Sequence, residues 1–209
     1  MTVEPRPAPV LFYFDFISPF GFLASLRVDA LAAKYGREAD WRSMLTGISV
    51  LKVMGLKPIP ETPLKGPYAQ RDAERYCRRH GVALSPPLGS GRVQPRPLAA
   101  GRAFHWLRRH DPGRAKPVAK RLLRACWQEG ADIGTPETVT AIAASEGVDS
   151  AALRDGFDSG EAALLLRAAV DESLAAGAFG SPFFIVDGEP FFGLEKMELL
   201  EEWLATGGW

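Results

Sequence analysis

A serine hydroxyl at the start of a predicted helix is the feature of this sequence best suited to chemistry. Ser18 follows the apolar run 10–16 and precedes Pro19, a residue type that suits the first turn of a helix. The first N–H groups of a helix lack partners within it and carry positive partial charge, so an anion such as a thiolate is stabilised there. Ser18 therefore has two interpretations, an N-cap or a donor to a bound anion, and the segment alone favours the N-cap.

A second Ser-Pro pair, Ser181-Pro182, stands directly before a predicted terminal hairpin. Such a pair is a candidate for a cis peptide bond, a geometry that would turn the backbone N–H and C=O groups of Ser181 outward. Ser181 could then bind an extended peptide ligand as a neighbouring strand does. The alternative is an ordinary trans proline that opens a strand.

Two charged residues are candidates for holding a charged ligand. Glu195 stands at the start of the last predicted helix, where it could meet an ammonium group. Lys65 could reach a carboxylate, and it lies just upstream of Tyr68, Asp72 and Arg75, whose helical spacing places them on one face. The alternatives are a solvated first-turn glutamate, a surface lysine and an Asp72–Arg75 surface pair.

Apolar patterning predicts the elements that position Ser18. Residues 10–16 read as a buried strand, residues 20–35 as a helix that stops at Gly36, and residues 40–45 as a second strand. A strand–helix–strand unit of this length has parallel strands.

The middle of the chain is predicted to be helical. Prolines at high density make residues 47–67 a loop, and residues 84–97 form an irregular loop. One helix begins after Thr135, a plausible N-cap. The other predicted helices cover residues 68–80, 98–109, 117–129, 150–156 and 161–176.

The chain returns to strands at 183–186 and 189–192 around an Asp187-Gly188 hairpin signal, and it ends with a helix over 194–204. The order βαβ, helices, ββα predicts an α/β fold of the thioredoxin-like type with an inserted all-helical domain. The predicted parts are an N-terminal tail at 1–9, a thioredoxin-like domain at 10–65 and 177–209, and an inserted helical domain at 66–176.

Composition excludes several classes of function. The 209 residues include 25 basic and 25 acidic side chains, so the formal net charge is zero. Nucleic acid and anionic membranes are therefore not expected as partners, because binding them requires a basic excess. The three histidines lack metal-ligand spacing, so no metal site is expected.

Cysteine usage and the termini bear on the compartment. Cys77 and Cys126 lie far apart and outside any C-x-x-C pair, which indicates buried thiols in a reducing compartment. The sequence shows neither a signal peptide nor an apolar run long enough to cross a bilayer. A cytoplasmic location is the resulting expectation.

Together these motifs resemble the 2-hydroxychromene-2-carboxylate isomerase family, which is related to kappa-class glutathione transferases within the DsbA-like group. The resemblance spans residues 10–204, and its most specific parts are Phe-Tyr-Phe-Asp-Phe-Ile-Ser-Pro-Phe around Ser18 and Gly-Ala-Phe-Gly-Ser-Pro-Phe-Phe around Ser181. It implies glutathione as cofactor, a small aromatic carboxylate as substrate, reversible thiolate addition as mechanism, and a homodimer.

The resemblance also implies a role for each candidate residue. Ser18 would donate to the sulfur of glutathione and hold it as thiolate. Ser181, before a cis Pro182, would pair with the cysteinyl backbone of glutathione. Glu195 would take the γ-glutamyl end, and Lys65 would meet a carboxylate of glutathione or substrate.

Three departures from the family pattern leave alternatives open. Leu56 and Leu194 stand where the family carries asparagine, and Arg96-Pro97 replaces a polar pair. The alternatives are a kappa-like glutathione transferase that conjugates electrophiles and a non-catalytic thioredoxin-fold binding protein. Disulfide exchange is not expected, because Ser18 and Gly21 occupy both reactive positions.

Overall fold

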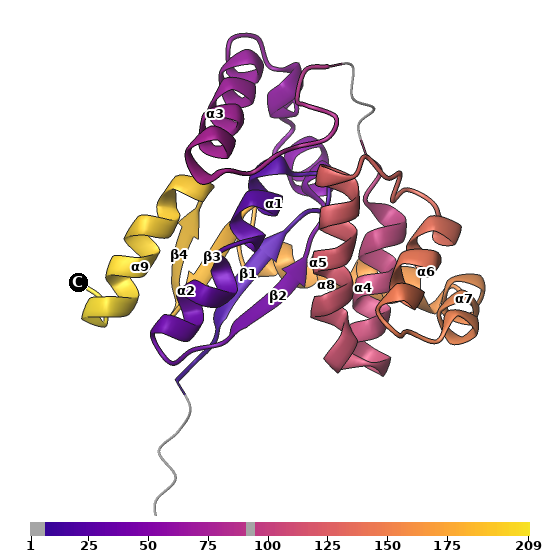
Figure 1. The fold of residues 1–209 in the computed structure, drawn as a ribbon. Coiled ribbons are helices and arrows are strands. Elements are labelled where there is room, and N and C mark those ends of the chain that lie inside the picture. The colour runs from indigo at the N-terminus through magenta and orange to yellow at the C-terminus, as the bar shows by residue number, and fades with distance from the viewer. Residues whose placement is uncertain (1–6, 91–94) are drawn as a thin grey trace, which may run out of the picture.

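The computed structural model describes residues 7–90 and 95–209. Its four-stranded sheet has the order β2-β1-β3-β4 (Figure 1). The strands are β1 (Val10–Phe14), β2 (Ala39–Ser43), β3 (Phe183–Val186) and β4 (Glu189–Phe192). β1 and β2 run parallel, whereas β3 is antiparallel to both of its neighbours. The predicted βαβ and ββα halves are thereby confirmed.

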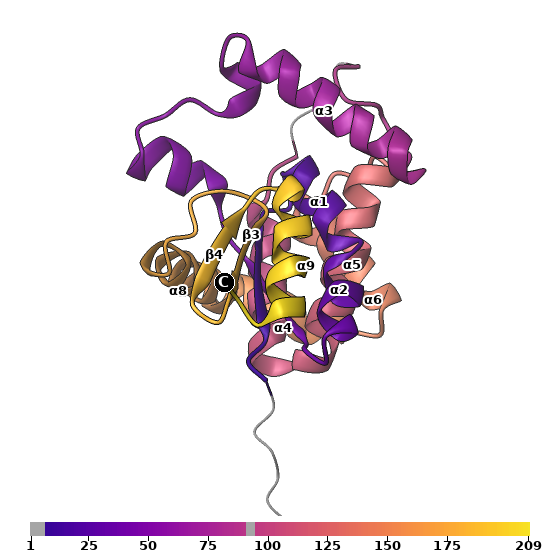
Figure 2. The same cartoon turned by 90° about the vertical axis from the view of Figure 1, so that its left-hand side faces the viewer.

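Alternation along β1 divides the sheet into two faces. Phe12 and Phe14 point to the main core, where Phe12 lies 5.1 Å from Trp41 and 5.4 Å from Phe184 between ring centroids. Tyr13 points to the opposite face and a smaller cluster. Helices α1 (Pro19–Ser25), α2 (Val28–Lys34) and α9 (Met197–Thr206) cover the first face, and α8 (Glu161–Ala175) lies beside the second (Figure 2).

The single helix expected over 20–35 is two helices, α1 and α2. Arg27 precedes α2 with φ −123°, outside the helical region, so the chain changes direction between them. Phe22 and Leu23 in α1 and Val28 in α2 are all buried in the main core. Because apolar residues continue on both sides of the break, periodicity could not reveal it.

The segment predicted as a loop over 47–67 contains short helical turns. The π-helix η1 (Gly47–Val53) and the 3₁₀-helix η2 (Ile59–Glu61) precede α3 (Lys65–His80). We call residues 47–64 the arm. α3 begins three residues before the predicted start, because Pro67 falls in its first turn, where proline is tolerated. α3 lies across the end of the molecule at which α1 begins (Figures 1 and 2).

The helical layer packs against the β2 edge of the sheet (Figure 1). Helix α5 (Pro112–Gln128) begins before the predicted residue 117 and encloses Pro117. The nearby residues Ala115 and Val118 are buried. The last helix opens as a 3₁₀ turn, η3 (Leu194–Lys196), before α9. The remaining helices are α4 (Leu98–His110), α6 (Pro136–Ser145) and α7 (Ser150–Asp158).

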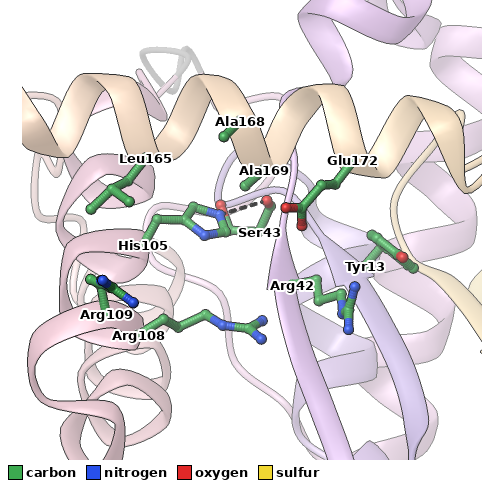
Figure 3. A pocket seen from close by; sticks show the side chains of 10 residues that line it. All are labelled: Tyr13, Arg42, Ser43, His105, Arg108, Arg109, Leu165, Ala168, Ala169 and Glu172. Carbon is green, nitrogen blue, oxygen red and sulfur yellow. Dashed lines mark hydrogen bonds between the residues drawn. The ribbon is translucent and has the colours of Figure 1, made fainter.

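Side chains from α4 and α5 close the open edge of β2. Lys116 Nζ donates to the carbonyl of Ala39 at 2.9 Å, and a guanidinium N–H of Arg108 donates to the carbonyl of Trp41. His105 Nε2 lies 2.9 Å from the carbonyl oxygen of Ser43 (Figure 3). Every second carbonyl of the edge strand thus has a side-chain donor, which blocks pairing with another strand.

The sequence also led to expectations about the cysteines, metal sites and membrane-spanning helices. Cys77 and Cys126 are buried, as predicted, and no disulfide joins them among the described residues. In the described ranges no group of three or more metal-ligating side chains comes together, and none of the helices drawn there is long and apolar enough to cross a membrane. Residues 1–6 of the predicted tail and 91–94 of the predicted 84–97 loop lie outside the described residues, and the domain bounds stay a prediction.

Candidate functional site

The hydroxyl of Ser18 is shared between its own helix and a distant loop. Ser18 has extended backbone geometry at the N-cap of α1, and its Oγ accepts from the N–H of Gly21 at 3.0 Å. The same Oγ donates to the carbonyl oxygen of Ser181 at 3.0 Å. The N-cap interpretation is confirmed, and the hydroxyl proton points to the Ser181–Pro182 turn.

The Ser181–Pro182 peptide bond is cis, as the sequence suggested. Ser181 Oγ accepts from the backbone N–H of Asp15 at 2.9 Å, and the carbonyl of Pro182 accepts from the N–H of Gly193 at 3.0 Å. The turn is therefore held on one side to Asp15, directly after β1, and on the other to Gly193, directly before the last helix. The carbonyl of Ser181 faces Ser18.

Gly21 permits this close approach. A Cβ at this position would lie 2.4 Å from Ser181 Oγ and 3.3 Å from the carbonyl oxygen of Asp15. Only a residue without a side chain allows α1 to reach the turn at this distance. The second reactive position of a redox relative is thus a glycine here, and the side chain of Ser181 fills the space beside it.

Asp15 organises the site, and sequence reasoning missed it. Its carboxylate is fully buried: one oxygen accepts from both the N–H and the hydroxyl of Thr46 at 2.7 Å, and the other accepts from the N–H of Ile17 at 3.2 Å. Its carbonyl accepts from the N–H of Ser18 at 3.0 Å. Burial raises the pKa of Asp15, and the Thr46 and Ile17 hydrogen bonds oppose that rise. A single acid inside an apolar strand segment was the available signal.

Glu195 lies near the turn because its carboxylate is beside Gly193, which is hydrogen-bonded to Pro182. A Cβ at Gly193 would be 2.7 Å from both carboxylate oxygens of Glu195, so the acid folds back over the glycine whose N–H binds Pro182. The side chain of Glu195 is exposed. Its carboxylate is therefore accessible to a cationic ligand group beside the turn.

Lys65 is the first residue of α3 and is exposed. Within the described part of the chain, no hydrogen bond or ion pair joins it to Ser18 or Ser181. Further along α3, Arg75 Nη1 and Asp72 Oδ1 form an ion pair at 2.6 Å. The structure thus brings Ser18, Ser181 and Pro182 together, and Lys65 is an exposed residue directly after the arm.

The departures from the family pattern occupy different environments. Leu194 is 5% exposed and belongs to the main core, whereas Leu56 is 57% exposed on the arm. Arg96 is exposed before α4, with its guanidinium 4.0 Å from Asp132. A polar group at 194 would be buried in apolar surroundings, and one at 56 would be in solvent.

Comparisons with known proteins agree with this fold. The family described as DSBA-like thioredoxin domain matches residues 9–205. A 2-hydroxychromene-2-carboxylate isomerase of Sphingobium xenophagum is 25% identical over 198 residues, covering 92% of this chain and 96% of that protein. Another of the same name, from Pseudomonas putida, is 22% identical over 191 residues and covers 91% of each chain.

Solved structures resemble the chain over most of its length. The structure of a 2-hydroxychromene-2-carboxylate isomerase superposes with a TM-score of 0.79 at 23% identity, covering 96% of this chain and 95% of the other. The cytosolic disulfide reductase DsbM from Pseudomonas aeruginosa with GSH gives a TM-score of 0.63 at 16% identity, covering 95% and 96%.

Proposed function

The chain belongs to the DSBA-like thioredoxin family, and from that premise we propose that it is a glutathione-dependent isomerase of 2-hydroxychromene-2-carboxylate or a related intermediate of aromatic-ring degradation. The names of the similar proteins support the reaction class. The observation that carries the proposal is the hydroxyl of Ser18, which caps α1 and points its proton to the cis-proline turn.

The reaction requires rotation about a conjugated carbon–carbon double bond. A thiolate adds to the enone carbon, a C–S bond forms, and the π electrons move to the carbonyl oxygen as a dienolate. The former double bond is now single and rotates. The dienolate then reforms the double bond and expels the thiolate, so glutathione is regenerated.

Glutathione binding would exchange the hydrogen bonds of two residues. The cysteinyl N–H of the tripeptide donates to the carbonyl of Ser181, which in this structure accepts from the hydroxyl of Ser18. The hydroxyl of Ser18 is then released and donates to the sulfur. A hydroxyl donor and the N-terminus of α1 both favour thiolate over thiol, which lowers the thiol pKa.

The charged candidates complete the proposed site. Glu195, folded over Gly193 beside the turn, binds the γ-glutamyl ammonium group. Lys65 binds a carboxylate of glutathione or substrate and, as a cation, favours the negative charge of the dienolate. A serine at position 18 suits this chemistry, since a cysteine there would exchange with glutathione disulfide, release one glutathione and stay blocked as a mixed disulfide.

We propose a homodimer in the cytoplasm. The arm and the start of α3 expose large apolar side chains, which in a monomer would stay in water. A second copy of the chain would cover them, and light scattering coupled to size exclusion tests this. Cys77 and Cys126 are buried and, among the described residues, no disulfide joins them, which suits a reducing compartment. The exposed apolar residues are Leu51, Val53, Met54, Leu56, Ile59, Leu64 and Tyr68.

Calorimetric titration with glutathione is the decisive test. Wild type should bind, and Ser18→Ala should bind more weakly. The matched control is Ser145→Ala, because Ser145 is an exposed helix serine whose hydroxyl donates to the carbonyl of Ile142 in the same helix. With a conjugated enone acid, recovered glutathione indicates the isomerase, whereas a stable adduct indicates the transferase. An absence of heat with wild type contradicts both and leaves the binding-protein alternative.

A further inference from the structure

A cavity of about 260 Å³ lies where the edge of β2 meets α4 and α8 (Figure 3). It shares no residue with the Ser18 site. Tyr13 and Arg42 reach it from the sheet face opposite the main core, and α4 and α8 supply the facing walls. Nothing in the proposed isomerase mechanism uses this cavity.

Positive charge exceeds negative charge around the cavity. Arg42, Arg108 and Arg109 line it, against the single carboxylate of Glu172. Outside the lining, Asp40 pairs with Arg42 at 2.8 Å and with Arg108 at 3.1 Å, and so offsets one of the three cations. The excess favours an anion, and planar guanidinium groups are suited to a carboxylate.

A buried hydroxyl in the wall lacks a partner. Ser43 is 1% exposed, and its Oγ forms no hydrogen bond within the described part of the protein. Leaving a buried hydroxyl unpaired is unfavourable, so a ligand oxygen would supply what the fold does not. Beside it, His105 Nε2 must carry the proton shared with the Ser43 carbonyl, since a carbonyl only accepts.

Apart from Glu172, the residues that α8 contributes to the wall are apolar. Leu165, Ala168 and Ala169 face the guanidinium groups across the space (Figure 3). A ligand here would place its charged end toward α4 and β2 and its apolar body against α8. The volume lies just below the ~300 Å³ at which pockets for drug-sized ligands begin, so the ligand is small.

We propose that this cavity is a second binding site, specific for a small organic carboxylate with an apolar body. The inference does not rest on the isomerase proposal. Glu172 points into the same space (Figure 3) and weakens anion binding by charge repulsion. Affinity should therefore move in opposite directions when charge is removed from the two sides of the cavity.

Calorimetry with benzoate as probe and neutral benzamide as control tests the site on the full chain. Wild type should bind benzoate saturably and benzamide at least tenfold more weakly. Arg109→Gln should weaken benzoate binding about two- to fivefold, and Glu172→Gln should strengthen it by a similar factor, as expected for partly exposed charge pairs. Both residues are exposed, so neither substitution threatens folding.

Ser18→Ala separates this site from the other one. Benzoate affinity unchanged in Ser18→Ala but shifted in both cavity variants supports the proposal. Benzoate affinity lost in Ser18→Ala and unchanged in Arg109→Gln and Glu172→Gln would place the ligand at the Ser18 site and overturn it. Absence of saturable binding to wild type, in low-salt buffer where screening is weak, overturns it as well.

Discussion

Ser18 Oγ and the carbonyl oxygen of Ser181 lie 3.0 Å apart although 163 positions separate the two residues in the sequence. This hydrogen bond joins the start of α1 to the loop before β3, and it places a donor proton where an incoming sulfur would compete for it. The Ser18 hydroxyl thus donates to an acceptor that the backbone of a bound peptide could also use. Variants at Ser18 test this relationship directly.

Replacing Ser18 by cysteine should convert the site from reversible thiolate stabilisation to covalent capture. A thiol at the N-terminus of α1 has its pKa lowered and attacks glutathione disulfide. We expect Ser18→Cys, but not wild type, to gain one glutathionyl group in intact-mass spectrometry, with loss of isomerase turnover that a reductant restores. A buried Cys77 or Cys126 modified in place of residue 18 would contradict this, and peptide mapping distinguishes them.

Gly21→Ala should disturb the cis-proline turn. The added Cβ would lie 2.4 Å from Ser181 Oγ, so the turn or α1 must shift and the Asp15 N–H would lose its acceptor. Overpacking of this kind costs about 1–3 kcal/mol of unfolding free energy. Urea unfolding measures the loss, with Gly113→Ala as control, because the nearest atom to its added Cβ is 3.9 Å away.

If Gly21→Ala has the same free energy of unfolding as wild type, the Ser181–Pro182 turn can move to accommodate the added Cβ at no cost. For the same steric reason, a Ser18→Cys/Gly21→Cys double variant should not recover a native-like disulfide exchange site, since the side chain at 21 has no room. Oxidation that closes this disulfide without loss of stability would show the packing argument to be wrong.

Sequence patterning sufficed for the strands, the hairpin and the cis-proline turn because each has a local signal. Phe183 to Phe192 carries its own turn residues, and Ser18 carries its own proline. Asp15, Thr46 and Gly21 were missed as a unit because their contacts bring together segments whose proximity only the tertiary structure determines.

The predicted ends of two helices were wrong for a related reason. The break at Arg27 and the early start of α5 depend on packing that periodicity does not encode. The cavity at β2 likewise had no local signature, because its arginines come from two elements that are far apart in the chain.

Thr46→Val should loosen the Ser18 site without touching Ser18. Thr46 Oγ1 donates to the buried Asp15 carboxylate at 2.7 Å, and valine leaves that oxygen with one donor fewer. Removing a hydrogen bond to a buried charged group costs about 1.5–3 kcal/mol. Glutathione affinity should fall with it, because a shift of Asp15 also moves its backbone carbonyl, which accepts from the N–H of Ser18. Thr62→Val is the control for both measurements, because the Thr62 hydroxyl donates to the carbonyl of Pro58 within the arm.

Restoring the family asparagines should give opposite results at the two positions. Leu194→Asn buries an amide in the main core and should cost about 2–5 kcal/mol of unfolding free energy. Leu56→Asn changes an exposed side chain and should stay within about 0.5 kcal/mol. If Leu194→Asn proves as stable as wild type, the residue faces a polar space that the structure does not show, and its role in ligand binding must be reconsidered.

His105 should make stability depend on pH. Burial lowers its pKa from 6.5 to about 4, so the folded protein keeps the ring neutral while the unfolded chain protonates it. Between these two pKa values the unfolded state therefore binds more protons than the folded state. The contribution of His105 to the free energy of unfolding is fully present above pH 6.5 and is lost as the pH falls toward 4. The gap corresponds to about 3 kcal/mol at most. Denaturant unfolding at several pH values should show this slope in wild type and a smaller slope in His105→Gln. The slope should persist in His110→Gln, whose ring is exposed beside Glu161; equal slopes in wild type and His105→Gln would assign the effect to other groups.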